Sequence, residues 1–379
     1  MADRSSAQWQ HLRFSLALQE VLAPGNDNSC FSPYSVASAL GMVCQAARGD
    51  TADEIRVLLA GGDADIAKQV DLLRDASTLA GGGNGEDPVF AVSNTLWAWE
   101  GLRLKEGYLT DLAGWPGARV QTAPFRADPE AARHAINTDV AETTHDLIKE
   151  LVPPGAVHVD TVASLVNALY LKAAWRNRFA DHDTSEEQFH TPTGSRPVAT
   201  MRQVERLGYA ARGGWQAVVL PAAGGVEAIV LLPDTDLPEA EAALDADVLA
   251  DVLAAPTKRQ VELHLPKLDL AMNAELVDSL RKLGVHQLFT TAADLGGLAE
   301  VTDDERLYVD RVLHESVLKI DEQGLEGAAA TAVMMRLTSM VVEQPVEVRA
   351  DRPFLLLIRH AATGAVYFLA RVTDPAAGN

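Results

Sequence analysis

Apolar residues at helical spacing dominate the first half of the chain. Gln8 to Leu22 has this spacing and is followed by Pro24-Gly25, which predicts a helix that ends there. A second helix is predicted to begin at Ser32-Pro33, because proline is favoured in the first turn of a helix. Thr51 to Glu54 has the form of a capping box and predicts another helix start. A further helix is predicted over Pro129 to Leu151.

Strand-like runs dominate the second half, although the first two of them come earlier. The predicted strands cover residues 89–99, 162–175, 261–270 and 307–321, several short strands between 198 and 232, and a final pair within 353–372 that is joined at 361–364. Two helices are predicted among them, over 239–253 and 274–283. Helices followed by strands predict an α+β fold with large mixed or antiparallel sheets.

Composition and charge exclude several classes of partner. The chain has 379 residues and a formal net charge of −21. Nucleic acids, glycosaminoglycans and anionic membranes are recognised through clustered Lys and Arg, so we expect none of these partners. The region 68–78, for example, has only Lys68 and Arg74 as basic residues. The chain has no run of eighteen apolar residues, so no membrane span is predicted.

The cysteines and the N-terminus add two expectations. Cys30 and Cys44 form no CxxC motif and have no neighbouring histidine tract, so we expect neither a metal site nor a cofactor. Two free, buried thiols are expected, and one disulfide between them is the alternative. Met1 to Ser6 is polar and lacks the pattern of a signal peptide. The protein is therefore expected in the cytoplasm, or secreted if a leader has been removed.

Motifs of common enzymes are absent from the sequence. It contains no GxSxG, no P-loop, no GxGxxG after a strand and no HExxH. His314-Glu315 begins a metalloprotease-like motif, but the second histidine is missing. We therefore expect a protein that is not an enzyme. The sequence does not exclude a catalytic triad formed by residues that are far apart along the chain.

Gln323 to Met340 is an unusual connection between two strand-like runs, because it is small, Ala-rich and almost uncharged. Read with a period of two, one face has Leu325 and the other has Glu326 and Arg336. The segment can therefore form a strand that is buried on one face only. An ordinary Ala-rich helix or a fixed strand would explain the same composition.

The residues around this segment resemble the serpin family of serine-protease inhibitors. Ile320 to Gly324, followed by Glu326 to Ala330, looks like the hinge of the serpin reactive loop. The resemblance extends over nearly the whole chain in matching order, through NSCFSPYSVASAL (28–40), GDTADE (49–54), VNALYLKAAW (166–175), LHLPKLDL (263–270), LGVHQLFTTAADLGGL (283–298), VLHESVLKIDEQG (312–324) and DRPFLLLIRHAATGAVYFLARVTDP (351–375).

The resemblance implies one domain over residues 1–379, with three β-sheets, eight or nine α-helices and an exposed reactive-centre loop over about 322–343. In this family a target serine protease cleaves the loop and forms an acyl-enzyme. The loop then inserts into a five-stranded sheet as a new strand and traps the protease. Insertion of Leu325 to Met335 would add eleven residues of ladder. At about 1 kcal/mol per hydrogen bond this gives on the order of 10 kcal/mol, similar to the stability of a whole domain.

The hinge and the reactive bond follow from the family's spacing. Counting about seventeen residues from Glu322 places the bond at Thr338-Ser339, which suits an elastase-like or subtilisin-like protease. Leu337 and Arg336 are rival positions and would suit chymotrypsin-like and trypsin-like targets. The hinge consists of Glu322, Gly324, Leu325, Glu326, Gly327, Ala328, Ala329 and Ala330. Leu325 departs from the usual Thr or Ser, and Gly327 from the usual Ala, so both are expected to weaken or slow insertion.

Other positions carry over one by one. Ser35, Asn167 and His314 match a polar cluster, called the shutter, beneath the sheet that opens. Lys267 and Glu322 match a charge pair at its upper end, called the breach, and Trp175 matches an aromatic residue there. Thr144 to Ile148 departs from the family pattern, since it replaces the usual Gly-Lys-Ile run after the helix that lies across the sheet. We expect a monomer that inhibits a protease; the alternative is a non-inhibitory serpin that binds a ligand or acts as a chaperone.

Overall fold

The computed structural model describes residues 3–62, 65–81, 87–112, 115, 117–159, 161, 163–300, 307–325 and 344–377. Within these residues the chain forms nine α-helices and three β-sheets, as the predicted α+β fold requires. The helices are α1 (Ala7–Leu22), α2 (Pro33–Ala46), α3 (Gly49–Ala60), α4 (Ile66–Ala76), α5 (Glu106–Leu112), α6 (Pro129–Thr143), α7 (Leu237–Ala242), α8 (Ala246–Ala254) and α9 (Val277–Lys282).

A six-stranded sheet forms one layer of the molecule. Its order is β11-β13-β14-β5-β2-β4. The strands are β2 (Val89–Trp99), β4 (Ala118–Ala123), β5 (Ala163–Ala174), β11 (Leu268–Glu275), β13 (Arg311–Ile320) and the two-residue β14 (Gly324–Leu325). Five of these strands are long, and β14 lies between two of them.

A nine-stranded sheet contains most of the remaining strands. Its order is β1-β17-β16-β9-β8-β7-β10-β15, and β6 pairs with β7. The strands are β1 (Ser29–Phe31), β6 (Ser185–Thr191), β7 (Gly194–Arg212), β8 (Trp215–Pro221), β9 (Val226–Pro233), β10 (Thr257–Pro266), β15 (Val346–Arg349), β16 (Phe354–His360) and β17 (Val366–Val372). A small third sheet pairs β3 (Arg103–Leu104) with β12 (Ala299–Glu300).

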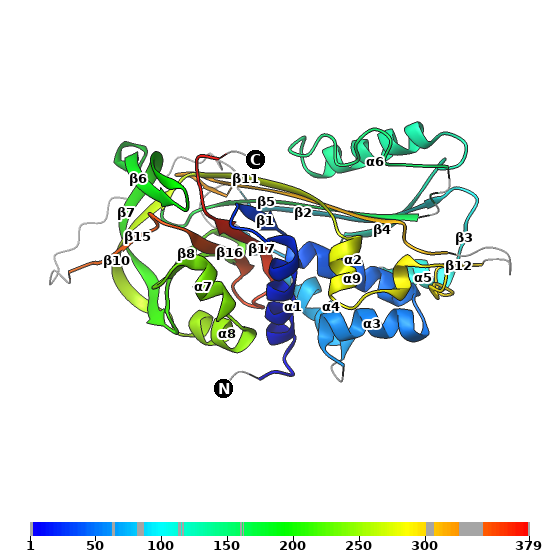
Figure 1. Cartoon of the computed structure of the whole chain (residues 1–379), viewed down its shortest axis with the longest axis horizontal. Helices are drawn as coiled ribbons and strands as arrows, with labels where there is room; N and C mark the ends of the chain where they lie inside the picture. Colours follow the sequence, from blue (N-terminus) through cyan, green and yellow to red (C-terminus); the bar gives the residue numbers. More distant parts are fainter. Residues whose placement is uncertain are drawn as a thin grey trace.

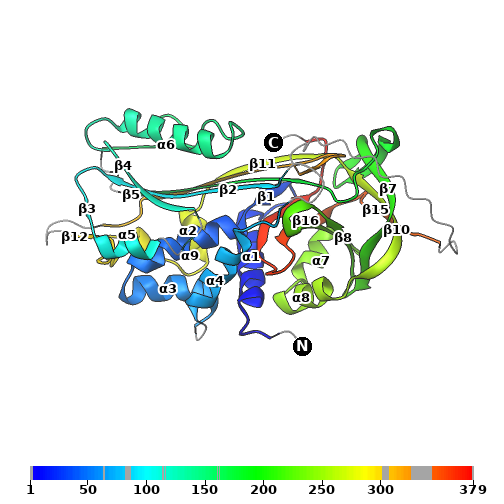
Figure 2. The same cartoon turned by 180° about the vertical axis from the view of Figure 1, so that it is seen from behind.

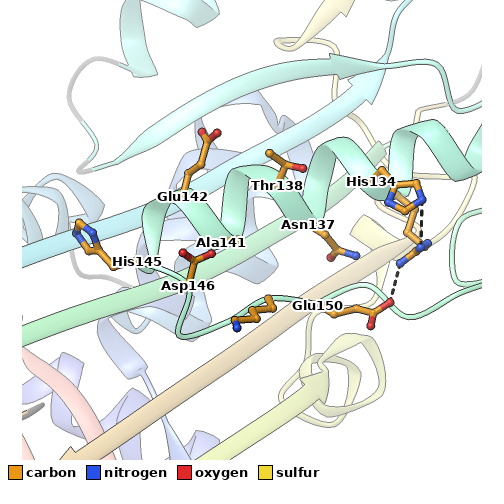
Figure 3. Close-up of a pocket in the computed structure, with 10 residues that line it drawn as sticks. His134, Asn137, Thr138, Ala141, Glu142, His145, Asp146 and Glu150 are labelled. Atoms are coloured by element: carbon orange, nitrogen blue, oxygen red, sulfur yellow. Dashed lines mark hydrogen bonds and ion pairs between the residues drawn. The ribbon is translucent and has the colours of Figure 1, made fainter.

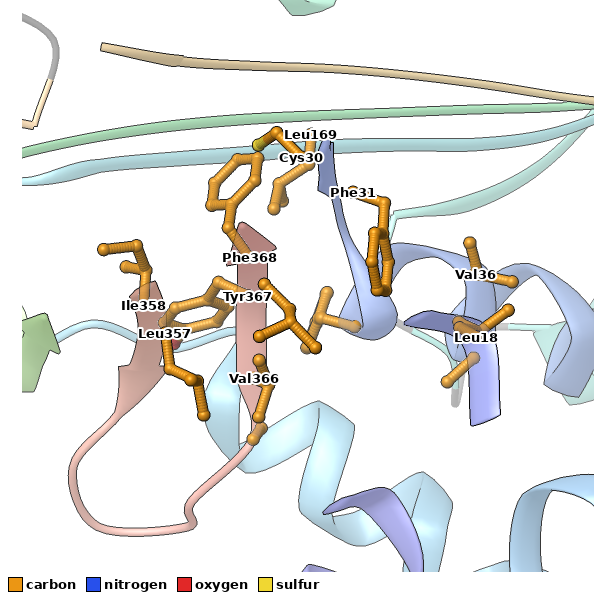
Figure 4. Packing of buried hydrophobic residues seen from close by; sticks show 14 of the residues in the cluster. Leu18, Cys30, Phe31, Val36, Leu169, Leu357, Ile358, Val366, Tyr367 and Phe368 are labelled. Carbon is orange, nitrogen blue, oxygen red and sulfur yellow. The ribbon is translucent and has the colours of Figure 1, made fainter. Parts of the chain in front are cut away.

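The two faces of the six-stranded sheet are covered differently. Helix α6 lies alone over one face, while α1 to α4 and α9 lie on the opposite side (Figures 1 and 2). The main core fills the second side, where Phe31, Phe368 and Leu169 pack together beneath the sheet (Figure 4). A separate apolar cluster joins Ile136 and Val140 of α6 to the sheet. The inner face of the sheet is therefore buried, whereas the outer face is buried beneath α6 and exposed elsewhere, as at Asp269 of β11. Helix α6 is the only helix on the outer side in these views.

Several predicted helices are confirmed, and others are shorter than predicted. Helix α1 and the start of α2 agree, with the Ser32 side chain accepting a hydrogen bond from the Ser35 backbone N–H. The capping-box interpretation of Thr51 is wrong, because α3 begins at Gly49 and Thr51 lies inside it. The Thr51 hydroxyl instead accepts a hydrogen bond from the Asp294 backbone N–H at 3.0 Å.

The predicted helix over 129–151 ends at Thr143, because the backbone of His145 and Asp146 turns into the left-handed region. The predicted helix over 239–253 is divided into α7 and α8, and the one over 274–283 is reduced to α9 because its first residues belong to β11. The predicted strand over 261–270 is two strands, since β10 and β11 belong to different sheets on either side of Lys267.

Strand predictions hold better, since β2, β5, β16 and β17 lie close to their predicted bounds. Cys30 and Cys44 are both buried free thiols, and burial raises the pKa of Cys30 to about 12. In the described part of the chain, no helix combines the length and hydrophobicity needed to cross a membrane.

Candidate functional site

The candidate site is the junction between β13 and β5, two parallel neighbours in the six-stranded sheet. Their ladder pairs Arg311 with Ser164 at one end and Ser316 with Leu169 at the other. Beyond this end β14 lies between the two strands and pairs antiparallel with both. The junction therefore has a closed lower part and an upper part that already contains another segment.

Strand β14 places Leu325 in the sheet. Leu325 pairs with Ile320 of β13 and with Ala173 of β5, and it is only 1% exposed. Its side chain belongs to the main core, on the face opposite to α6. This is the face that a period of two assigns to Leu325, so a leucine is accommodated at this position.

Gly324 approaches the backbone of β5 more closely than any other residue type allows. A Cβ atom at this position would lie 2.3 Å from the carbonyl oxygen of Ala173. Real Cβ atoms do not approach backbone atoms so closely, and the neighbouring atom cannot rotate away. The pairing of β14 with β5 therefore requires glycine here.

The upper end of the junction is held by contacts of residues 321–323. The Trp175 indole N–H donates to the Asp321 carbonyl oxygen at 2.9 Å. Lys267 Nζ lies 2.8 Å from Glu322 Oε2, and the Thr184 hydroxyl donates to Glu322 Oε1 at 2.8 Å. Burial opposes the charged form of Glu322, but the hydrogen bonds from Lys267 and Thr184 outweigh it and lower the pKa of this carboxyl. The structure thus brings together the three residues predicted at the entrance.

A chain of buried polar groups crosses the closed part of the junction. His314 of β13 and Asn167 of β5 are register partners, and His314 Nδ1 lies 2.8 Å from Asn167 Oδ1. The Ser32 backbone N–H donates to His314 Nε2 at 3.1 Å. The Asn167 side-chain amide donates to the Ser35 carbonyl oxygen at 2.8 Å and to Asn94 Oδ1. The chain therefore links α2, β13, β5 and β2.

These contacts define the state of the histidine. Because Nε2 accepts a hydrogen bond, the proton of the neutral ring is on Nδ1 and is donated to Asn167. His314 is fully buried, and this desolvation lowers its pKa to about 4. A second proton on the ring would remove the acceptor for Ser32. His314 is therefore neutral in the folded protein at pH 7.

The polar cluster predicted at Ser35, Asn167 and His314 is present, and two further polar residues, Asn94 and Ser316, lie in or beside it. Ser35 takes part through its carbonyl oxygen, and its hydroxyl has no hydrogen-bond partner among the described residues. Asn94 and Ser316 were missed by the sequence analysis. The Ser316 hydroxyl donates to the Cys30 carbonyl oxygen at 2.6 Å. Asn94 could have been found from the sequence, because it is a polar residue within the apolar run 89–99.

The reactive bond lies outside the described residues. This applies to Thr338 and Ser339, to the rival positions Arg336 and Leu337, and to the hinge residues Glu326, Gly327, Ala328, Ala329 and Ala330. Of the predicted hinge, the structure describes Glu322, Gly324 and Leu325.

An open cleft of about 690 Å³ runs along α6 and the segment that follows it (Figure 3). Its lining includes His134, Glu142, His145 and Asp146. Within the described residues no group of three or more His, Cys, Asp or Glu side chains could hold a metal ion. The cleft lies between α6 and the segment that follows it, and the buried Arg133 and Asn137 of α6 are also part of its lining.

Comparisons with known proteins agree with this geometry. The family model described as serpin (serine protease inhibitor) matches residues 10–375. Iripin-2 of Ixodes ricinus is 33% identical over 95% of this chain and 91% of its own length. An uncharacterized serpin-like protein of Thermococcus kodakarensis is 30% identical over 96% of this chain and 85% of its own length. The structure of uncleaved ovalbumin, 25% identical, covers 98% of this chain and all of its own with a TM-score of 0.84.

The chain therefore belongs to the serpin family, and its architecture is the serpin fold.

Gly324→Ala is expected to prevent β14 from pairing with β5, because the added methyl group would overlap the Ala173 carbonyl. The amide of Leu325 should then exchange with solvent faster, and the free energy of unfolding should fall by about 1–3 kcal/mol. Gly107→Ala is the matched control, since nothing lies within 4 Å of a Cβ atom at that helical position. Unchanged exchange at Leu325 would contradict the proposed close approach.

The pH dependence of stability should contain a contribution from His314. Its pKa is about 4 in the folded state and about 6.5 when unfolded, so the unfolded state binds more protons between these values. The contribution is complete above pH 6.5 and is lost as the pH falls toward 4. Between pH 7 and pH 5 it amounts to about 2 kcal/mol.

Urea unfolding of wild type and His314→Gln at both pH values measures this difference. The variant should lose about 2 kcal/mol less than wild type on acidification. His11→Gln is the control for a buried histidine elsewhere in the protein, because burial also lowers the pKa of His11 to about 4 and this residue lies on α1. Only the His314 variant should change the acid-induced exchange of the amides of residues 312–316. Equal losses in wild type and His314→Gln would show that His314 does not titrate in this way.

Proposed function

We propose that this serpin is an inhibitor of serine-type endopeptidases and acts as a suicide substrate. The protease would cleave the segment between β14 and β15, and the part attached to β14 would then extend as a strand between β13 and β5. The observation that carries this proposal is β14 itself. Leu325 of β14 already pairs with both strands, and Gly324 pairs with β5, at the point where the segment proposed to be cleaved begins.

The topology gives a reason for this extension to be favourable. Strands β13 and β5 are parallel, whereas β14 is antiparallel to both. A strand that continues β14 would replace one parallel pairing by two antiparallel pairings. Each added residue gains ladder hydrogen bonds, and antiparallel pairs are slightly more stable per residue than parallel pairs. The uncleaved protein would then be held kinetically, because its loop cannot reach this arrangement while both ends are fixed.

The hydrogen-bonded chain through His314 and Asn167 would oppose the separation of β13 from β5. An incoming strand must separate these register partners and break their 2.8 Å hydrogen bond. Breaking a buried hydrogen bond without replacing it costs about 1–3 kcal/mol per group. A strand that offers its own backbone groups replaces the lost ladder bonds, so the barrier is local and can be overcome.

The chemistry at the loop would follow the protease's own mechanism. The catalytic serine of the protease would form an ester with the carbonyl carbon of Thr338, and the peptide nitrogen of Ser339 would leave as a new amino terminus. Thr338 suits elastase-like or subtilisin-like proteases, while bonds after Leu337 or Arg336 would suit chymotrypsin-like or trypsin-like ones. Insertion before hydrolysis of the ester would trap the protease.

Incubation with elastase, subtilisin, chymotrypsin and trypsin tests this proposal. At least one protease should give a covalent complex that survives SDS, and the mass of the released C-terminal fragment identifies the bond. The expected fragment begins at Ser339. Thr338→Asp should abolish the complex without changing the fold, because an acidic side chain does not fit these specificity pockets.

The alternative is a non-inhibitory serpin that binds a ligand or acts as a chaperone. Cleavage of the loop without any complex, and without a rise in the melting temperature of the nicked protein, would favour this alternative. A rise in melting temperature without a complex would mean that the strand inserts but too slowly to trap the proteases used.

A further inference from the structure

Residues 144–152, which follow α6, form a turn and a return segment over the outer face of the six-stranded sheet. Here the sequence departs from the serpin pattern at Thr144 to Ile148. His145 and Asp146 have φ values of 50° and 63°, in the left-handed region that glycine adopts most easily. The turn is held by a hydrogen bond from the Asp146 N–H to the Ala141 carbonyl oxygen at 2.8 Å. The Thr144 hydroxyl donates to the Val140 carbonyl oxygen at 2.8 Å.

This turn places the His145 ring on Tyr170 of β5. The ring centroids are 4.7 Å apart with an interplanar angle of 57°, which is a favourable tilted aromatic contact. Tyr170 is only 6% exposed. It directly follows Leu169, where the β13–β5 ladder ends, and precedes Ala173, where β14 pairs. The contact therefore lies beside the place where β13 and β5 separate.

The return segment continues from this contact to the other side of the junction. Ile148, Leu151 and Val152 are buried in a cluster that includes Val166 of β5 and Leu313 of β13. The Asn273 side-chain amide of β11 donates to the Leu151 carbonyl oxygen at 3.5 Å. Residues 144–152, which we call the strap, thus contact β5 at one end and β11 at the other.

We propose that the ring contact of His145 with Tyr170 is a latch, a contact that slows the separation of β5 from β13. A new strand would move these strands apart by about 4.8 Å. The strap contacts both sides, so it must release one end or lose the packing of its three buried apolar side chains. His145 is then a positioning residue for loop insertion, and its function rests on the proposed inhibitory mechanism.

The test compares His145→Ala with His145→Phe and with wild type. Alanine removes the ring, whereas phenylalanine keeps a ring that can contact the ring of Tyr170. His134→Ala is the matched control, because His134 lines the same cleft and its polar contacts among the described residues are with Glu130 and Arg133 of its own helix and not with β5. Asp146→Gly is a second control, since it keeps the ring and removes one unfavourable left-handed residue.

Hydrogen exchange of uncleaved protein gives the first readout, over peptides that cover residues 170–174. His145→Ala should exchange about 3- to 10-fold faster than wild type, as expected for loss of one aromatic contact. His145→Phe, His134→Ala and Asp146→Gly should exchange at the wild-type rate. Wild-type exchange in His145→Ala would overturn the proposal, and so would equally fast exchange in His145→Ala and His145→Phe.

The second readout is the time that loop-nicked protein needs to become heat-resistant. His145→Ala should become resistant about 3- to 10-fold sooner than wild type, and His145→Phe should not. If no variant ever becomes resistant, the proposed inhibitory mechanism fails, and the exchange rates alone decide whether His145 is a latch. An equal rate in wild type and His145→Ala would overturn its action on insertion.

Discussion

The pairing of two parallel strands, β13 and β5, is the constraint on which the rest of this structure depends. Their ladder ends at Ser316 and Leu169, and only a few residues further on β14 pairs with both strands. Each group of contacts that we describe acts on this one junction. Glu322, Lys267 and Trp175 hold its upper end, His314 and Asn167 cross its closed part, and α6 with the strap covers its outer face at β5 and β13.

The contacts at the junction differ in how easily they can be exchanged. The ladder hydrogen bonds can be replaced by those of an incoming strand, because every backbone offers the same groups. The side-chain bonds of His314 and Asn167 have no such replacement in the apolar surroundings of the sheet, so their loss opposes opening. A ring contact such as that of His145 with Tyr170 is intermediate, since an aromatic pair contributes only about 0.5–1.5 kcal/mol. This order would allow the sheet to be stable at rest and still accept another strand, as the proposed function requires.

Local patterns predicted single elements well where one periodicity was unbroken. The runs that became α1, β2, β5 and the β16–β17 pair were visible from the sequence, and their bounds differ little from the prediction. Predictions failed where a change of direction lacked a strong local signal. Lys267 separates β10 from β11, although the apolar pattern continues across it. Helix α6 ends at Thr143, and the left-handed turn that follows is formed by His145 and Asp146 without a glycine or proline. In these places tertiary contacts outweigh local preference.

The sequence by itself determined the family and the α+β class, because these depend on the order of motifs and on the periodicity of apolar residues. The segment that would be cleaved stays a prediction. The sequence also identified Lys267, Glu322, Trp175, Asn167 and His314 as members of a site, but only through resemblance to the family. The tertiary structure decided which strands meet at the junction, that Leu325 is already within the sheet, and that His145 contacts Tyr170. Residues far apart along the chain carry no local signal of their contact, since only the packing of α6 and the sheets brings them together.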